Sequence, residues 1–168
     1  MRRLRTRRIF TVVALICTAF MGYALYAEHI LGLVPCPLCM LQRVAMLLVL
    51  LVCLIASVHN PSSRGGWRAY GVLGFLAAGL GVAIAGRHVW LQHLPPDQVP
   101  ACAPSLDYML DVFPLGETLR TILMTSGECA EIDWAFLGLS MPGWTLIWFV
   151  LFALVLGFTG WFSHSRGR

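Results

Sequence analysis

The sequence predicts an all-α integral membrane protein: a four-transmembrane-helix bundle with a long periplasmic loop that carries a short amphipathic helix. Of the 168 residues, 58% are hydrophobic and only 12% are charged, and the mean hydropathy is +0.76. Water-soluble domains do not have this composition. Four apolar stretches are long enough to cross about 30 Å of hydrocarbon. They divide a single membrane domain, 1–168, into spans at residues 9–27, 40–58, 69–85 and 144–162.

The charged residues predict the orientation of these spans, because arginine beside a membrane segment is retained on the cytoplasmic side. Nine of the twelve arginines lie before the first span, between the second and third, or after the fourth: Arg2, Arg3, Arg5, Arg7, Arg8, Arg64, Arg68, Arg166 and Arg168. Every acidic residue falls in the loops at about 28–39 and 90–143. We therefore expect a multi-pass membrane protein with both termini in the cytoplasm. The net charge of +4 then reflects topology and does not indicate nucleic-acid binding.

A cleaved signal peptide is an alternative interpretation of the first apolar stretch, which follows a basic run. This stretch is longer than a typical signal core, and Leu25 breaks the pattern of small residues that would precede cleavage before Glu28. We expect it to be retained as the first span.

Small residues in the third span predict close helix packing. Gly74 with Ala78, and Ala77 with Gly81, form small-xxx-small pairs that let two helix backbones approach each other. In the long loop, apolar residues recur at helical spacing after a proline, at Leu115, Leu119, Ile122 and Leu123. This pattern predicts the short amphipathic helix, which either lies on the membrane surface or packs on a small core of the loop.

The six cysteines divide by position. Cys17 and Cys53 lie inside apolar spans, where a thiol packs as a small hydrophobic group. The other four are predicted on the periplasmic side, a compartment that favours disulfides: Cys36, Cys39, Cys102 and Cys129.

Cys36 and Cys39 form a C-x-x-C unit at the start of the second span. The small ring that such a disulfide closes suits a reversible redox pair or half of a metal site better than a structural crosslink. Pro37 is compatible with the first helical turn, so the helix N-terminus would stabilise a thiolate, chiefly at Cys39. Cys102 and Cys129 are equally open to a structural and a redox interpretation. Zinc bound by all four cysteines is less favoured, because the second pair lacks close ligand spacing.

Two further polar residues lie at a depth in the membrane where such side chains are unfavourable unless they are paired or have a function. Arg43 is one turn deeper than Cys39 and could hold an anion or a polarised carbonyl, or simply extend to the interface. His88 ends the glycine-rich span beside Arg87, and with Arg43 it could bracket a polar ring system.

These residues resemble the bacterial disulfide bond formation protein B (DsbB) family over essentially the whole chain. The matching features are Pro35-Cys36-Pro37-Leu38-Cys39 with Gln42-Arg43, Arg87-His88, the spaced Cys102 and Cys129, and the segments 126–131, 134–139 and 141–142. Leu41-Gln42 stands where the best-known member of the family has an aromatic–acidic pair.

The resemblance implies a disulfide-generating thiol:quinone oxidoreductase. Cys102 would form the mixed disulfide with DsbA, a soluble periplasmic thiol oxidase, and Cys129 would exchange with Cys36. Cys39 would react with a membrane quinone, ubiquinone or menaquinone, at a site that includes Arg43 and His88. The DsbA–DsbB–quinone chain is the known route that keeps the bacterial periplasm oxidising. No metal site is expected.

Three other interpretations stay open from the sequence. One is a quinone-linked thiol protein resembling vitamin K epoxide reductase, whose loop organisation differs. Another is a non-enzymatic membrane protein with static disulfides. The third is a metal-handling protein.

Overall fold

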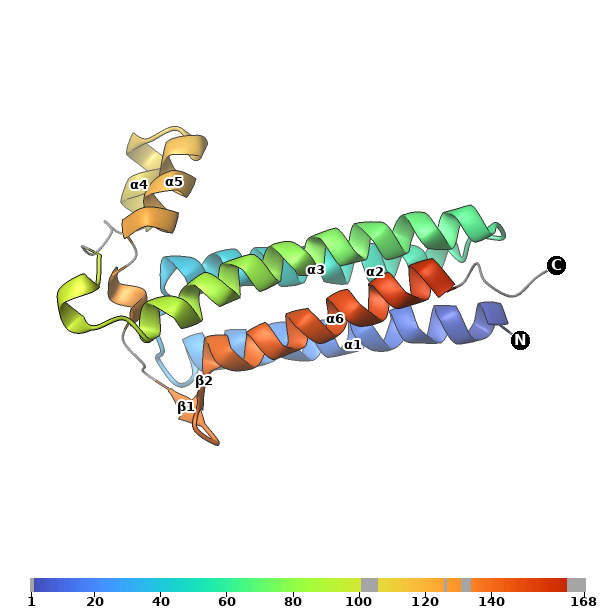
Figure 1. Cartoon of the computed structure of the whole chain (residues 1–168), viewed down its shortest axis with the longest axis horizontal. Coiled ribbons are helices and arrows are strands. Elements are labelled where there is room, and N and C mark those ends of the chain that lie inside the picture. The colour runs from blue at the N-terminus through green and yellow to red at the C-terminus, as the bar shows by residue number, and fades with distance from the viewer. Residues whose placement is uncertain (1, 101–105, 126, 131–133, 163–168) are drawn as a thin grey trace.

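The structure is a computed structural model that describes residues 2–100, 106–125, 127–130 and 134–162. Among these residues, four helices are long and apolar enough to cross a membrane, and they pack side by side as a bundle (Figure 1). The elements follow in the order α1 (Arg2–His29), α2 (Pro37–His59), α3 (Arg64–Gln92), the 3-10 helix η1 (Pro96–Gln98), α4 (Leu106–Val112), α5 (Leu115–Thr125), the 3-10 helix η2 (Gly127–Ala130), β1 (Ala135–Phe136), β2 (Leu139–Ser140) and α6 (Met141–Phe162).

All four predicted spans are therefore confirmed as helices, but each helix is longer than its apolar stretch. The largest difference is in α3, which continues beyond residue 85 to Gln92. The apolar stretch in the sequence ends before Arg87 because this residue is charged. The helix continues past it because its backbone hydrogen bonds do not depend on side-chain polarity. Arg87 and His88 consequently have fixed directions on a helix.

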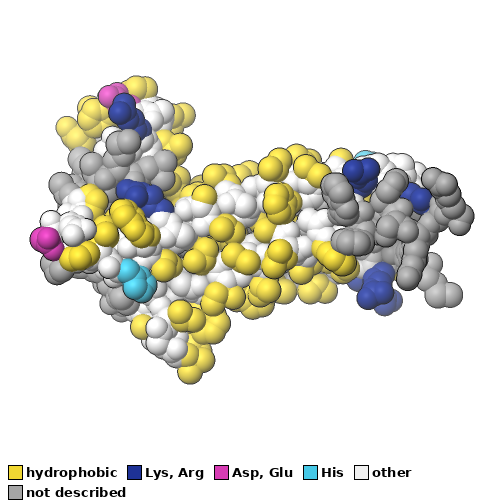
Figure 2. Space-filling view, in the orientation of Figure 1, with side chains coloured by type: hydrophobic (Ala, Val, Ile, Leu, Met, Phe, Trp, Pro, Cys, Tyr) yellow, Lys and Arg dark blue, Asp and Glu magenta, His cyan; other side chains and the backbone are white. Residues whose placement is uncertain are grey.

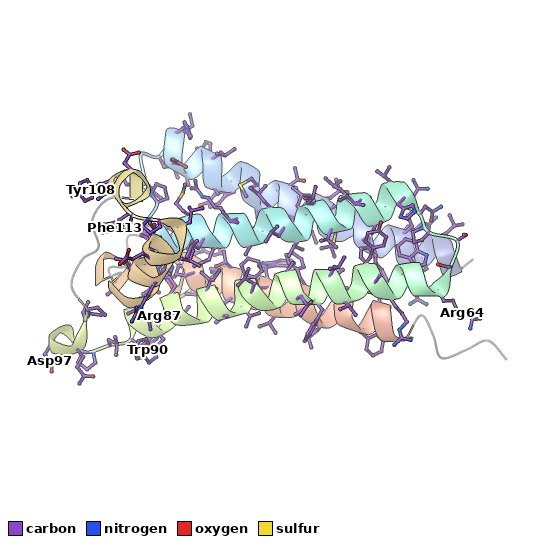
Figure 3. All side chains as sticks on the ribbon, turned by 90° about the horizontal axis from the view of Figure 1, so that it is seen from above. Arg64, Arg87, Trp90, Asp97, Tyr108 and Phe113 are labelled. Atoms are coloured by element: carbon purple, nitrogen blue, oxygen red, sulfur yellow. The ribbon has the colours of Figure 1, made fainter. Side chains whose placement is uncertain are left out.

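The two termini lie at the same end of the bundle, and the loop between α3 and α6 lies at the other (Figure 1). On the face drawn in Figure 2, acidic side chains appear only at the loop end, while basic side chains appear at both ends. Figure 3 labels Arg64 at the terminal end, and Asp97 and Arg87 at the loop end. Hydrophobic side chains cover the length between the two ends, as expected of a surface that contacts lipid.

A line of small buried residues on α3 packs against α6. Its members are Gly71, Gly74, Ala78, Gly81 and Ala85, and His88 continues the same face at the loop end. A Cβ atom on Gly71 would lie 2.5 Å from the Cα of Gly160 in α6, which shows how closely the backbones approach. The predicted close packing is confirmed, and it orients His88 into the bundle.

The long loop contains two short helices, of which the sequence predicted only α5. Met109 of α4 and Ile122 of α5 are buried, and the Thr118 hydroxyl donates a hydrogen bond to the Met109 carbonyl at 3.1 Å. Leu115 is 77% exposed and Leu119 is 48% exposed. Met109 and Ile122 belong to the same cluster of buried residues as the bundle, and α5 contacts α2, so these helices pack on the bundle rather than on a separate core of the loop, and they also present leucines outward.

A β-hairpin just before α6 was not predicted. Strands β1 and β2 pair through a turn at Leu137 and Gly138, with φ of 53° and 79°. Positive φ at both central residues is typical of the type I′ turn that suits a two-residue hairpin. The indole N–H of Trp144 donates to the Phe136 carbonyl at 3.1 Å and ties the hairpin to α6.

The glycine contact between α3 and α6 gives a test of the packing. Gly71→Ala should lower the midpoint of thermal unfolding in detergent micelles by about 2 to 10 °C, because overpacking costs about 1–3 kcal/mol. Gly79→Ala is the matched control, since no atom lies within 4 Å of a Cβ placed there. It should leave the midpoint unchanged or raise it, because alanine favours helix. Equal destabilisation by both changes would contradict the packing.

Candidate redox site

The C-x-x-C unit lies at the first turn of α2. Cys36 is the N-cap residue, and its sulfur accepts a hydrogen bond from the Cys39 backbone N–H at 3.3 Å. Pro37 occupies the first helical turn, where its missing N–H leaves no hydrogen bond unmade. The sulfur atoms of Cys36 and Cys39 are 3.0 Å apart, and both residues are thiols here. The sequence placed this unit correctly at the start of the helix.

The loop brings another cysteine to this unit. Cys129, in η2, is 1% exposed, and η2 packs against the end of α3. The Cys36 sulfur, the Cys129 sulfur and a ring nitrogen of His88 all lie within 4.8 Å of one another. Cys36 therefore has Cys39 on one side and Cys129 on the other, an arrangement that allows disulfide exchange between two partners.

The two thiols outside the spans have opposite electrostatic environments. Hydrogen bonding to Cys129 and then to Cys39, together with desolvation, raises the pKa of Cys36 above its ordinary value. The hydrogen bond from Cys36 lowers the pKa of Cys129, and desolvation opposes this shift without cancelling it. The hydrogen bond between the two sulfurs therefore favours the proton on Cys36 and negative charge on Cys129. Since the thiolate is the nucleophile in exchange, Cys129 is suited to attack a disulfide.

His88 is held by a buried chain of polar groups. Its Nε2 lies 3.9 Å from the Cys36 sulfur, and its Nδ1 lies 2.9 Å from the side-chain amide of Gln42. The other end of that amide is 2.6 Å from the Thr145 hydroxyl, which is also 3.0 Å from the Pro142 carbonyl. His88 and Gln42 are 3% and 6% exposed, so these contacts replace water for both side chains.

The chain of hydrogen bonds is complete in two arrangements. In the first, Thr145 donates to the Gln42 oxygen and the Gln42 NH₂ donates to Nδ1, so His88 presents an N–H to Cys36. In the second, the amide is turned over: His88 donates from Nδ1 to the Gln42 oxygen, the NH₂ donates to Thr145, and Thr145 donates to the Pro142 carbonyl. His88 Nε2 then faces Cys36 as an acceptor. Rotation of one amide therefore changes which proton-transfer role His88 can take.

Arg43 forms an ion pair with Glu28 of α1, and its second guanidinium nitrogen donates to the Ala24 carbonyl at 3.1 Å. The side chains are 20% and 31% exposed. The sequence indicated that Arg43 requires an interaction partner or a function at this depth, but it did not identify Glu28 as that partner. The ion pair fixes the guanidinium against a cavity that both residues line.

That cavity has a volume of about 380 Å³ and lies between α1, α2, α6 and the hairpin. The lining includes a set of polar and sulfur groups: Cys36, Cys39, Gln42, Arg43, His88 and Cys129. Aromatic rings dominate the remainder: Phe20, Tyr23, Trp134, Phe136, Trp144, Trp148 and Phe149. The size falls in the range of small-molecule sites, about 300–1,000 Å³.

The structure thus brings together five of the six residues proposed from the sequence, namely Cys36, Cys39, Arg43, His88 and Cys129. Cys102 lies outside the described residues. Arg87, which precedes His88, stacks over the Trp90 ring at 5.2 Å and points to the outside of α3 (Figure 3).

Sequence reasoning did not assign roles to Gln42, Thr145 or Glu28. Gln42 carried a signal, since it is a polar side chain one turn inside the membrane and next to Arg43. The sequence carried no signal for Thr145, because a threonine in an apolar span can satisfy its hydroxyl by a hydrogen bond to a backbone carbonyl of its own helix. Glu28 was counted only as a loop charge.

Comparisons with known proteins agree with this architecture. The family profile described as Disulfide bond formation protein DsbB matches residues 6–159. A Disulfide bond formation protein B from Marinobacter nauticus is 53% identical over 90% of this chain and 89% of its own. Proteins of the same name from Acinetobacter baumannii and Hahella chejuensis are 50% and 47% identical, over 91% and 97% of this chain and 90% and 98% of theirs. The protein is therefore a multi-pass membrane protein that belongs to the DsbB family of disulfide bond formation proteins.

Proposed function

We propose that this protein is a thiol:quinone oxidoreductase that re-oxidises a DsbA-type periplasmic dithiol oxidase. The observation that carries the proposal is that Cys36, Cys39 and Cys129 all line one cavity that is rich in aromatic side chains. Thiols that only stabilise a fold have no need of such a cavity. The protein would lie in the bacterial inner membrane with its termini in the cytoplasm, because nine of the twelve arginines flank the spans on the side of the termini.

The residues present fit a quinone. The cavity is apolar along most of its lining, and quinone rings and isoprenoid tails are apolar. Arg43 and His88 line the cavity together with the cysteines, where they can donate hydrogen bonds to the carbonyl oxygens of a quinone ring. A quinone supplies an acceptor for two electrons and two protons. Arg43 would orient that acceptor, and His88 would deliver or hold a proton next to Cys36.

The proposed sequence begins with disulfides Cys36–Cys39 and Cys102–Cys129. A thiolate of the reduced partner attacks Cys102 and releases Cys129 as a thiolate. Cys129 then attacks Cys36 and releases Cys39. The second thiol of the partner then attacks the partner's sulfur in the mixed disulfide, which forms the partner's disulfide and releases Cys102. Cys102 attacks Cys129 in the Cys36–Cys129 disulfide and releases Cys36. Two electrons and two protons have moved from the partner to the Cys36/Cys39 dithiol, and re-forming that disulfide passes them to the quinone.

Energetics favour a membrane acceptor for this chemistry. DsbA is a strong oxidant at about −120 mV, and each 30 mV corresponds to about 1.4 kcal/mol for a two-electron couple. A disulfide of ordinary, lower potential cannot re-oxidise it. An acceptor of higher potential dissolved in the bilayer removes this difficulty and explains why Cys36 and Cys39 lie at the membrane end of the site while Cys102 belongs to the loop.

The relay can be tested by the initial rate of quinone reduction by purified protein supplied with reduced DsbA. Cys39→Ser and Cys102→Ser should each lower turnover by more than about 1,000-fold, since each removes a group that forms a covalent bond in the cycle. Cys53→Ala, which removes a thiol buried in the bundle, is the matched control and should retain wild-type turnover. Turnover that survives either serine variant would refute the order of exchange, and an inactive wild type would favour static disulfides.

The buried polar chain can be tested with a pair of threonine variants on α6. Thr145→Val removes the hydrogen bond to Gln42 and should lower kcat about tenfold, the equivalent of about 1.4 kcal/mol, with little change in KM for quinone. The pH dependence of kcat should shift as well, because the His88 proton is no longer positioned. Thr159→Val is the control, since Thr159 bonds only to carbonyls of its own helix at 2.8 and 3.0 Å. Equal rates and pH profiles in the two variants would show that Thr145 has only a structural role.

A further inference from the structure

The cluster formed by Cys36, Cys129 and His88 has the composition of a transition-metal site. Thiolate and imidazole are the ligands that zinc-class ions prefer, and the three ligand atoms lie within 4.8 Å of one another. The sequence pointed away from zinc because it paired the four cysteines only with each other. The structure instead combines the C-x-x-C unit with a histidine from α3 and a single loop cysteine.

We propose that the dithiol form of this protein binds one thiophilic ion of the zinc class, Zn²⁺ or Cd²⁺, through Cys36, Cys129 and His88, with Cys39 as the fourth ligand. Binding releases the thiol protons of the coordinating cysteines and involves no electron transfer. Any disulfide among these cysteines removes ligands, so the oxidised protein does not bind the ion.

The spacing of the atoms fits tetrahedral coordination. Bonds of about 2.3 Å to sulfur and 2.0–2.1 Å to nitrogen place neighbouring ligand atoms about 3.5–3.8 Å apart. The Cys36 sulfur lies 3.9 Å from His88 Nε2 and 3.0 Å from the Cys39 sulfur. No two of the three ligand atoms from Cys36, Cys129 and His88 are more than 4.8 Å apart, so adjustments of about 1 Å would bring them to these separations. Cys39 lies beside Cys36 as a further thiol. Two cysteines separated by two residues are also a common half of a zinc site.

The groups behind His88 fit a ligand role too. A metal-bound histidine usually donates its other ring N–H to an oxygen, which fixes the ring and its tautomer. Gln42 provides that oxygen when its amide accepts from Nδ1, and Thr145 then accepts from the Gln42 NH₂. In this arrangement Nε2 carries a free lone pair and faces Cys36. The same polar chain that positions His88 for proton transfer thus also prepares it as a ligand.

The consequence for activity rests on the proposed function. The ion would occupy the sulfurs that must form disulfides, so it would block passage of electrons to the quinone until it dissociates. Zinc-class ions would therefore inhibit turnover reversibly, and a chelator would restore it.

Binding itself can be measured without quinone or DsbA. The full-length protein in detergent, reduced with a thiol-free phosphine, would be titrated with Co²⁺ as a spectroscopic probe and with Zn²⁺ in competition. We expect one ion per chain, thiolate-to-cobalt charge-transfer absorption, and no binding by the oxidised protein. X-ray absorption of the zinc form should give a shell of sulfur with one nitrogen. A shell of only oxygen and nitrogen, or equal binding by the oxidised form, would overturn the site.

Variants assign the ligands. Cys129→Ser and His88→Ala should each weaken zinc binding by at least about tenfold. His29→Ala is the control for the histidine, because His29 is also at this end of the bundle and bonds only to the Leu25 carbonyl, at 3.1 Å. Cys17→Ala controls for a cysteine buried elsewhere. Unchanged affinity in both Cys129→Ser and His88→Ala would overturn the proposal. Zinc binding without quinone turnover would refute only the proposed function, and turnover without zinc binding would refute only this site.

Discussion

The close approach of α3 and α6 is the constraint on which the site depends. Gly71 and Gly160 allow the two backbones to come together, and the same face of α3 continues to His88 at the loop end. Because a helix is rigid over this length, the glycine contacts near one end fix the direction of the histidine near the other. His88 then meets Gln42 from α2 and Thr145 from α6, and three helices are joined by one buried chain of hydrogen bonds.

This construction places the polar chemistry at the boundary between two solvents. Charged and polar side chains are costly within hydrocarbon unless they are paired, and each one described at this site has a partner: Arg43 pairs with Glu28, and Gln42 bridges His88 and Thr145. The sulfurs need no such compensation, because thiols are soft and weakly polar. Cysteine can therefore connect the loop between α3 and α6 with a largely apolar cavity, where an unpaired charge would be unfavourable.

Much of this arrangement could be predicted from the sequence. Apolar stretches identified the helices, small residues identified the packed face of α3, and Pro37 indicated that the C-x-x-C unit begins a helix. These features depend on local composition, which a sequence displays directly. The approach of Cys129 to Cys36 could not be derived that way, because it depends on how the loop folds over the end of α3. The family resemblance suggested it, and η2 now supplies the contact.

The remaining features were hidden for physical reasons. Gln42 and Thr145 are ordinary polar residues whose roles appear only when α2 and α6 lie side by side. Strands β1 and β2 have two residues each, too few to show an alternating pattern, and the turn at Leu137 uses a residue that seldom adopts positive φ. Helix α4 has seven residues and is held by its contact with α5, so it carries little signal of its own.

The contact between Cys36 and Cys129 is the central claim, and a disulfide-trapping measurement tests it most directly. A variant with Cys39→Ser and Cys102→Ser leaves these as the only two thiols at the site. After mild oxidation with oxidised glutathione, peptide mapping by mass spectrometry without reduction should find a Cys36–Cys129 disulfide within most chains, since disulfides form only between cysteines held within a few ångströms of bonding geometry. Chains that stay reduced, or that crosslink only to other chains, would contradict the arrangement described for this site.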